Sequence, residues 1–186
     1  MARPDEVNGR YSAVSLTLHW LIAALVVGQV LLIMAHDGVS GSDPDPWMPL
    51  HKANGIMILL LTVVRIGWRL AHPAIPLPDH LPRWQKLIAR GTHVGFYLVL
   101  IAMPLGGWLA MSFFGRPIDM YGIFDWPTLP VETSRDAGRS VIDLHEMLAK
   151  ALYVLIAAHV AGALKHHFIN KDNVARRMLP FLPRRP

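Results

Sequence analysis

Histidine is abundant in this chain and could bind a metal or a prosthetic group: the sequence has ten histidines and no cysteine. The lack of cysteine excludes disulfides, iron–sulfur clusters and thiol catalysis. Two of the histidines, His145 and His159, lie 14 residues apart in an apolar segment. On an α-helix, this spacing separates them by about 21 Å along the axis and only about 40° around it. Two imidazoles on one helix face, nearly a bilayer apart, predict two stacked prosthetic groups.

The composition indicates that these histidines lie in a membrane protein. Hydrophobic residues make up 53% of the chain, which is too high a share for a typical soluble domain. Each of four apolar runs has about the 20 residues that a helix needs to cross a bilayer, and they lie near residues 15–35, 50–70, 91–113 and 141–164. Loops rich in proline and glycine separate the runs. We therefore expect an all-α fold over residues 1–186: one up-down bundle of four transmembrane helices.

The distribution of charge predicts how this bundle sits in the membrane. A net charge of +5 could indicate a nucleic-acid partner, but the basic residues flank the apolar runs, as membrane anchors do. The N-terminal tail, the second loop and the C-terminal tail hold 13 of the 18 Lys and Arg residues. The positive-inside rule therefore puts both termini in the cytoplasm. The first run lacks an obvious small-residue cleavage site, so we expect a retained span.

This topology gives four histidines a predicted depth and so pairs them. His19 and His159 lie toward the cytoplasm, whereas His51 and His145 lie at the outer side. A pair of imidazoles across a helical bundle suits a planar macrocycle with iron between them. A Cys-x-x-Cys-His motif is absent, which excludes covalent c-type attachment. The bundle is therefore predicted to enclose two haems b, and because both axial positions are filled, their role is electron transfer.

Two other interpretations compete with haem ligation. A zinc site would need its ligands clustered at one depth, whereas a spacing of 14 residues separates them. A structural membrane protein would keep these histidines as buried, hydrogen-bonded side chains. Ionisable groups inside a bilayer are rare and usually functional, however, and four that match pairwise in depth favour ligation.

Further polar residues are predicted to lie beside the two haems. Arg65 follows His51 by 14 residues and therefore reaches the depth of the inner haem, where it would pair with a propionate or with a lipid phosphate. His93 opens the third run without a partner left at its depth, and it would bond a propionate or a quinone carbonyl, or lie in the headgroup zone. The outer loops are acidic overall, but a local positive rim for the outer haem would come from Lys52, Arg135 and Arg139.

Four segments of the sequence resemble one known family, the bacterial cytochrome b561 family of four-helix dihaem proteins. They are Leu18-His19-Trp20, His51-Lys-Ala-Asn-Gly55, Leu144-His-Glu-Met-Leu-Ala149 and the closing stretch Ala158-His159-Val-Ala-Gly-Ala-Leu-Lys-His-His-Phe-Ile-Asn-Lys-Asp-Asn173. The resemblance covers nearly the whole chain. It implies a multi-pass protein of the bacterial inner membrane with His19, His51, His145 and His159 as haem ligands, in the pairs given above.

The resemblance also implies an activity, that of a superoxide oxidase. Superoxide would give its electron to the haems on the periplasmic side, and ubiquinone would be reduced in the membrane. The rim residues Lys52, Arg135 and Arg139 would attract the anion. His93, His166 and Lys171, toward the cytoplasm, would contact the quinone or the propionates. The alternative is an electron-transfer cytochrome subunit that serves a periplasmic dehydrogenase or hydrogenase and docks through its long third loop.

Overall fold

Four long helices make up most of the computed structural model, which describes residues 11–39, 45–79, 81–179 and 181–182. They are α2 (Ala13–Asp37), α3 (Trp47–Ala71), α4 (Arg83–Phe113) and α5 (Arg135–Leu164). All four are long and apolar enough to cross a membrane. This confirms the predicted all-α membrane fold. The first ten residues, counted above in the basic N-terminal tail, lie outside the described part.

Two of the helices begin earlier than the apolar runs that predicted them. Helix α4 starts at Arg83, whereas the run starts near residue 91, and α5 starts at Arg135, whereas the run starts near residue 141. Local sequence sets these starts: Pro82 precedes α4, and the Ser134 hydroxyl accepts a hydrogen bond from the Ala137 N–H to cap α5. Hydropathy alone misses such polar first turns because it detects only the apolar part of a helix.

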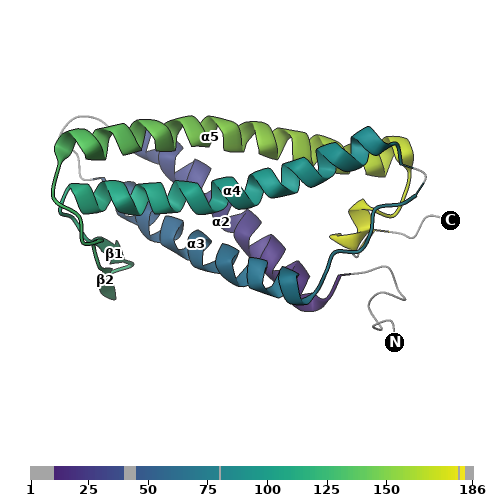
Figure 1. The fold of residues 1–186 in the computed structure, drawn as a ribbon, viewed down its shortest axis with the longest axis horizontal. Helices are drawn as coiled ribbons and strands as arrows, with labels where there is room; N and C mark the ends of the chain where they lie inside the picture. The colour runs from purple at the N-terminus through teal and green to yellow at the C-terminus, as the bar shows by residue number, and fades with distance from the viewer. Residues whose placement is uncertain (1–10, 40–44, 80, 180, 183–186) are drawn as a thin grey trace.

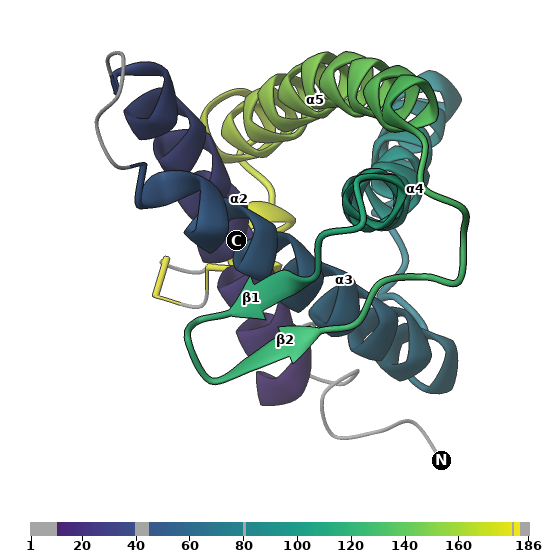
Figure 2. The same ribbon diagram turned by 90° about the vertical axis from the view of Figure 1, so that its left-hand side faces the viewer.

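The helices form a bundle with two distinct ends. The start of α2 lies at one end, called the terminal end here, which also holds residues 72–79, 81–82, 165–179 and 181–182 (Figure 1). The opposite end, the hairpin end, holds residues 114–134. Viewed from the hairpin end, α4 and α5 form one side of the bundle and α2 and α3 the other (Figure 2). Helix α3 packs against both α2 and α4, so it joins the two sides.

The bundle has a small core and an apolar exterior. The buried cluster at its centre takes residues from every long helix, among them Ile22, Ile58, Val99 and Leu152. Many other large apolar side chains point outward, and Val154, for example, is 69% exposed. An apolar exterior over a thin core is what lipid-facing helices require.

A short β-hairpin covers the start of α3, where the sequence predicted only a loop. Strands β1 (Ile118–Met120) and β2 (Phe124–Trp126) pair antiparallel, and Ile118 lies opposite Trp126. The turn between them needs positive φ angles, 58° at Tyr121 and 73° at Gly122. One face of β1 is buried in a cluster with Ala53 and Ile56 of α3. Strands of three residues are too short to show a period in the sequence.

Candidate cofactor sites

The hairpin end holds the first predicted histidine pair. His51 lies in the second turn of α3 and His145 in the third turn of α5. Their ring centroids are 6.3 Å apart with an interplanar angle of 72°. Two imidazoles on one metal ion have centroids roughly 6 Å apart, because each metal–nitrogen bond is about 2 Å and each ring centre lies about 1 Å further out. The spacing therefore fits a pair of axial ligands.

A backbone carbonyl fixes the orientation of His145. Its Nδ1 lies 2.9 Å from the Met103 carbonyl oxygen. Because a carbonyl only accepts, Nδ1 must carry the proton, which leaves Nε2 with a free lone pair. Histidines that bind metals usually donate their second N–H in this way. Gly107 on α4 leaves room for the ring, since a Cβ there would lie 3.6 Å from it.

His51 is held differently. Its backbone carbonyl accepts a hydrogen bond of 3.0 Å from Gln29 Nε2 of α2. Its ring Nδ1 is buried and has no hydrogen-bond partner among the described residues. An imidazole with one nitrogen buried and unpartnered, facing a second imidazole, is poorly satisfied by protein alone. This fits a residue whose ring serves a bound group.

The terminal end holds the second predicted pair. The ring centroids of His19 on α2 and His159 on α5 are 6.2 Å apart, with an interplanar angle of 59°. Phe96 of α4 meets the His159 ring edge-on at 5.4 Å. Arg65 lies beside the pair at the depth predicted for it, with Nη2 3.4 Å from His19 Nδ1 and Nη1 3.4 Å from the Ser15 carbonyl oxygen. Two histidine pairs of similar spacing therefore lie one above the other along α5.

His93 lies next to His159, a contact that was not among the predicted ones. The two ring centroids are 5.6 Å apart. The reason is the early start of α4: His93 lies ten residues into the helix, almost three turns from its first residue Arg83, so it faces the bundle as a helix-interior residue. The residue as a whole is exposed. His93 therefore adds a third imidazole directly beside the second pair.

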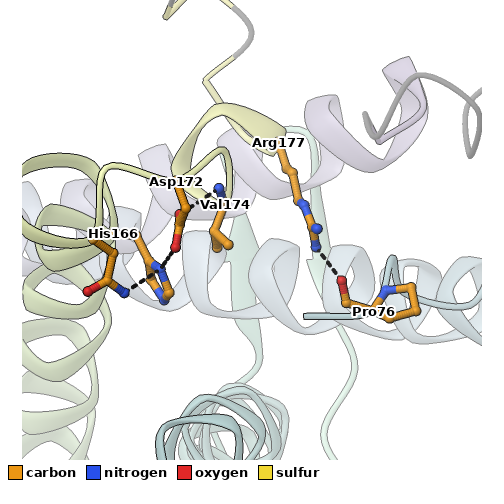
Figure 3. Close-up of polar contacts among 6 residues, drawn as sticks. Pro76, His166, Asp172, Val174 and Arg177 are labelled. Atoms are coloured by element: carbon orange, nitrogen blue, oxygen red, sulfur yellow. Dashed lines mark hydrogen bonds and ion pairs between the residues drawn. The ribbon is translucent and has the colours of Figure 1, made fainter. Parts of the chain in front are cut away.

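His166, in contrast, is part of a turn at the terminal end. Helix α5 continues into a π-helix, Lys165–Asn170, in which His166 lies. Its Nδ1 pairs with Asp172 Oδ2 at 2.7 Å, and Asp172 Oδ1 accepts the Val174 N–H at 2.9 Å (Figure 3). Lys171 ends the π-helix with a φ of 55°, and its side chain is exposed. In the described part of the chain, no hydrogen bond joins His166 or Lys171 to His93.

Hydrogen bonds hold the C-terminal segment, which follows the closing stretch, against the bundle. Arg177 Nη1 donates to the Pro76 carbonyl oxygen at 2.7 Å, which fastens the segment to the link between α3 and α4 (Figure 3). Trp20 Nε1 of α2 donates to the Met178 carbonyl oxygen at 2.9 Å. The residues that follow the closing stretch therefore hold the C-terminal segment against the terminal end of the bundle.

Only part of the predicted positive rim lies directly beside the first histidine pair. Arg135 and Arg139 are both exposed in the first two turns of α5. Lys52 is half-buried beside His51, and its charge interacts with those of Arg116 and Asp45. Sequence reasoning missed Arg116 as a rim residue, because only the turn at Gly115, with a φ of 65°, brings it back toward α3.

The histidine pairs do not extend into a cluster suited to zinc. Within the described ranges, no three His, Asp or Glu side chains come together as a metal-ion site. Each macrocycle needs only two axial ligands, so pairs suffice for haem. The arrangement therefore fits haem better than a tetrahedral metal ion.

Comparison with known proteins supports this interpretation. The family model described as prokaryotic cytochrome b561 matches residues 10–181. "Cytochrome b561 homolog 2" of Escherichia coli K12 is 37% identical over 180 residues, which cover 91% of each chain. "Probable superoxide oxidase CybB" of Yersinia pestis is 30% identical over 180 residues, or 94% of this chain and 98% of that protein. "Cytochrome b561 homolog 1" of E. coli K12 is 31% identical and covers 92% of this chain and 97% of its own length.

Proposed function

Because the chain belongs to the prokaryotic cytochrome b561 family, we propose that it is a dihaem oxidoreductase that passes electrons from a periplasmic donor to membrane ubiquinone. The family is one of b-type haem proteins, and the chain is a multi-pass protein of the bacterial inner membrane. A haem b with two axial imidazoles supplies one-electron transfer. The observation that carries the proposal is the presence of two imidazole pairs, 6.3 Å and 6.2 Å apart, near opposite ends of α5.

In this proposal each pair holds one haem. His51 and His145 hold the haem at the hairpin end, and His19 and His159 hold the haem at the terminal end. Arg65 lies where a propionate of the second haem would find a guanidinium partner. The distribution of basic residues in the sequence supports an orientation with the terminal end in the cytoplasm and the hairpin end in the periplasm.

The proposed donor is superoxide. The Yersinia relative that is named a probable superoxide oxidase supports this choice at 30% identity. Lys52 follows His51 directly in the sequence and interacts electrostatically with Arg116, so the two cations would raise the local concentration of a small anion. The balanced reaction takes one electron from each of two superoxide ions, releasing two molecules of dioxygen. The two electrons and two protons convert one ubiquinone to ubiquinol.

The proposed acceptor binds at the terminal end. His93 is exposed at membrane depth and its ring lies 5.6 Å from that of His159, so a quinone that diffuses in the bilayer can reach it. The imidazole N–H would bond a quinone carbonyl and help to deliver a proton from the cytoplasmic side. His166 and Lys171 lie further toward the cytoplasm, where they would contact the quinone or the propionates from the aqueous side.

Stopped-flow mixing tests the activity directly. The purified, haem-loaded protein is mixed with superoxide under anaerobic conditions, and haem reduction is followed by absorbance with and without a soluble ubiquinone analogue. We expect haem reduction to outpace the spontaneous dismutation of superoxide, followed by reoxidation when the quinone is present. Haem reduction no faster than dismutation would exclude superoxide as the donor.

One observation favours the second candidate function, an electron-transfer subunit that serves a periplasmic dehydrogenase or hydrogenase. At the tip of the hairpin Ile123 is 79% exposed and Phe124 is 53% exposed, as expected of a surface that docks another protein. The same stopped-flow experiment separates the candidates, because a relay subunit would stay oxidised with superoxide alone and would need its partner to be reduced.

A further inference from the structure

Gln29 is an uncharged polar residue in the membrane-spanning part of α2, and its side chain points at the first histidine pair. Its Nε2 donates to the backbone carbonyl oxygen of His51 at 3.0 Å. Gly55, one turn after His51, lies against this amide: a Cβ at Gly55 would lie 3.6 Å from Gln29 Nε2, an ordinary van der Waals contact. A buried amide in an apolar helix is unfavourable unless all its polar atoms are paired. Its presence beside His51 therefore needs an explanation.

Two buried atoms in this contact lack a hydrogen-bond partner among the described residues: Gln29 Oε1 and His51 Nδ1. The first can only accept a hydrogen bond, and the second donates one whenever iron is bound at Nε2. They belong to two residues that already share a hydrogen bond, so an unpaired donor and an unpaired acceptor lie on residues in direct contact. The nearby carboxamide of Asn54 is already used, because its Oδ1 accepts from the Tyr121 hydroxyl at 2.9 Å.

The partner histidine shows what such a contact does. His145 Nδ1 donates to the Met103 carbonyl oxygen, and this bond leaves Nε2 free to bind. We propose that the side-chain carbonyl of Gln29 accepts the Nδ1 proton of His51, so that Gln29 is a positioning residue that orients this haem ligand. The inference rests on the proposed function, because it requires His51 to be a haem ligand.

Such a hydrogen bond makes an imidazole a stronger donor to the iron. A stronger donor stabilises the ferric state and so lowers the reduction potential of that haem. Gln29 would thereby set the potential of the hairpin-end haem against that of the terminal-end haem. Its removal is expected to shift the ferric-to-ferrous ratio of the hairpin-end haem about tenfold at a fixed ambient potential, which is about 59 mV for a one-electron couple.

The experiment is a redox titration of the purified, haem-loaded protein, with the potential of each haem read from its absorbance band and the ligand field from electron paramagnetic resonance. Gln29→Leu should raise the potential of the hairpin-end haem and alter its g values. Gln29→Glu, which offers a stronger acceptor, should lower the potential. The terminal-end haem is the internal control and should not change in either variant. Asn54→Leu is the matched control, because it removes an amide that bonds the hairpin and not the ligand.

The outcomes separate the inference from the function on which it rests. If His51→Ala loses the hairpin-end haem while both Gln29 variants keep the wild-type potential and g values, the positioning role is excluded and the ligand assignment stands. If His51→Ala retains both haems, the ligand assignment and the role of Gln29 are both overturned. Should Gln29→Leu fail to incorporate haem, Gln29→Glu decides alone, because a potential equal to or above that of the wild type contradicts the inference.

Discussion

The two histidine pairs have nearly the same spacing but different surroundings. At the hairpin end, β1 covers the start of α3, and a backbone carbonyl holds His145. At the terminal end, the pair has a third imidazole, that of His93, and a guanidinium, that of Arg65, as direct neighbours. The ring of His145 is thus held by a backbone group, whereas the second pair has an imidazole and a guanidinium as direct neighbours. This difference suits electron entry at one end and proton-coupled quinone reduction at the other.

The largest expected effect is the loss of one haem per ligand substitution. We expect His51→Ala and His145→Ala each to remove the hairpin-end haem, because a macrocycle with one axial ligand is held weakly in a bundle core. His19→Ala and His159→Ala should remove the terminal-end haem. Haem content per chain, measured as the pyridine haemochrome, should fall by roughly half in each case.

His72→Ala is the matched control for these variants. His72 stacks on Trp68 with centroids 3.8 Å apart, outside both pairs, so this change should keep the full haem content. Spectra and potentials identify the haem that remains in each variant. If His51→Ala and His19→Ala removed the same haem, the assignment of ligands to two ends would be wrong.

The next prediction concerns the role of His93, which is either a contact of the quinone or an axial ligand of a haem. His159 has two imidazole neighbours, His93 at 5.6 Å and His19 at 6.2 Å between centroids. We expect His93→Ala to keep both haems and to slow ubiquinone reduction about a hundredfold, the low end of what a proton-transfer group contributes. Stopped-flow reoxidation by a quinone analogue measures this rate.

The same variant can reverse the assignment at the terminal end. If His93→Ala loses a haem while His19→Ala keeps both, the axial pair is His93 with His159. His93→Gln is a useful companion to the alanine variant, because it retains a hydrogen-bond donor but cannot shuttle a proton as imidazole does. A quinone rate restored by glutamine would point to binding and not to proton transfer.

The sequence predicted the helices and the histidine pairs because both follow from regular geometry. A spacing of 14 residues and an alternating topology are enough to bring His51 near His145 and His19 near His159. It did not predict that His93 neighbours His159, since that contact depends on residues 83–90, a mixed polar and apolar segment that extends α4 before the apolar run. Such residues have no hydropathy signal.

Contacts that depend on the conformation of a turn also could not be predicted from the sequence. Arg116 reaches the neighbourhood of Lys52 only through the turn after α4, and the role of His166 in a turn depends on Asp172, six residues later. Both contacts require backbone conformations that are set by tertiary packing. The histidine types and spacings therefore indicated two pairs, whereas the groups that make the two ends different became visible only in three dimensions.

A smaller effect concerns the cations at the hairpin end. We expect Lys52→Gln and Arg116→Gln each to lower the rate constant for haem reduction by superoxide about threefold at low ionic strength, because each removes part of the attractive field. The difference from the wild type should shrink as salt is added, since the Debye length falls to about 8 Å at physiological ionic strength. Stopped-flow measurements at two ionic strengths check both points.

The control for these variants lies at the other end of the molecule. Arg83→Gln at the start of α4 removes a cation of the terminal end and should leave the rate constant unchanged. An equal loss in all three variants would mean that overall charge, and not a local rim beside His51, attracts the anion. Arg135→Gln and Arg139→Gln should have intermediate effects, because both side chains are exposed on α5.

The smallest effect is a pH dependence at the start of α3. Burial alone would raise the pKa of Asp45, but hydrogen bonds from the backbone N–H groups of Trp47 and Met48, with the neighbouring His36, bring that pKa below its usual value. A carboxyl with a lowered pKa stabilises the folded state fully above its unfolded pKa of about 3.9, and this contribution is lost as pH falls through the lower, folded value. Asp45 thus caps the helix that carries His51.

Acid should therefore loosen the hairpin-end pair before the terminal-end pair. In the wild type, lowering the pH from 7 to below about 4 should lower the temperature at which the hairpin-end haem is released. Asp45→Asn should start from a slightly lower release temperature at pH 7 and show a smaller further drop, because it has no carboxylate to lose. Asp79→Asn, at the terminal end, should behave as the wild type does. Equal acid sensitivity of the two haems in the wild type would show that the cap at Asp45 does not govern the hairpin-end site. An acid response of Asp45→Asn as large as that of the wild type would show the same, because the carboxyl of Asp45 would then make no contribution to it.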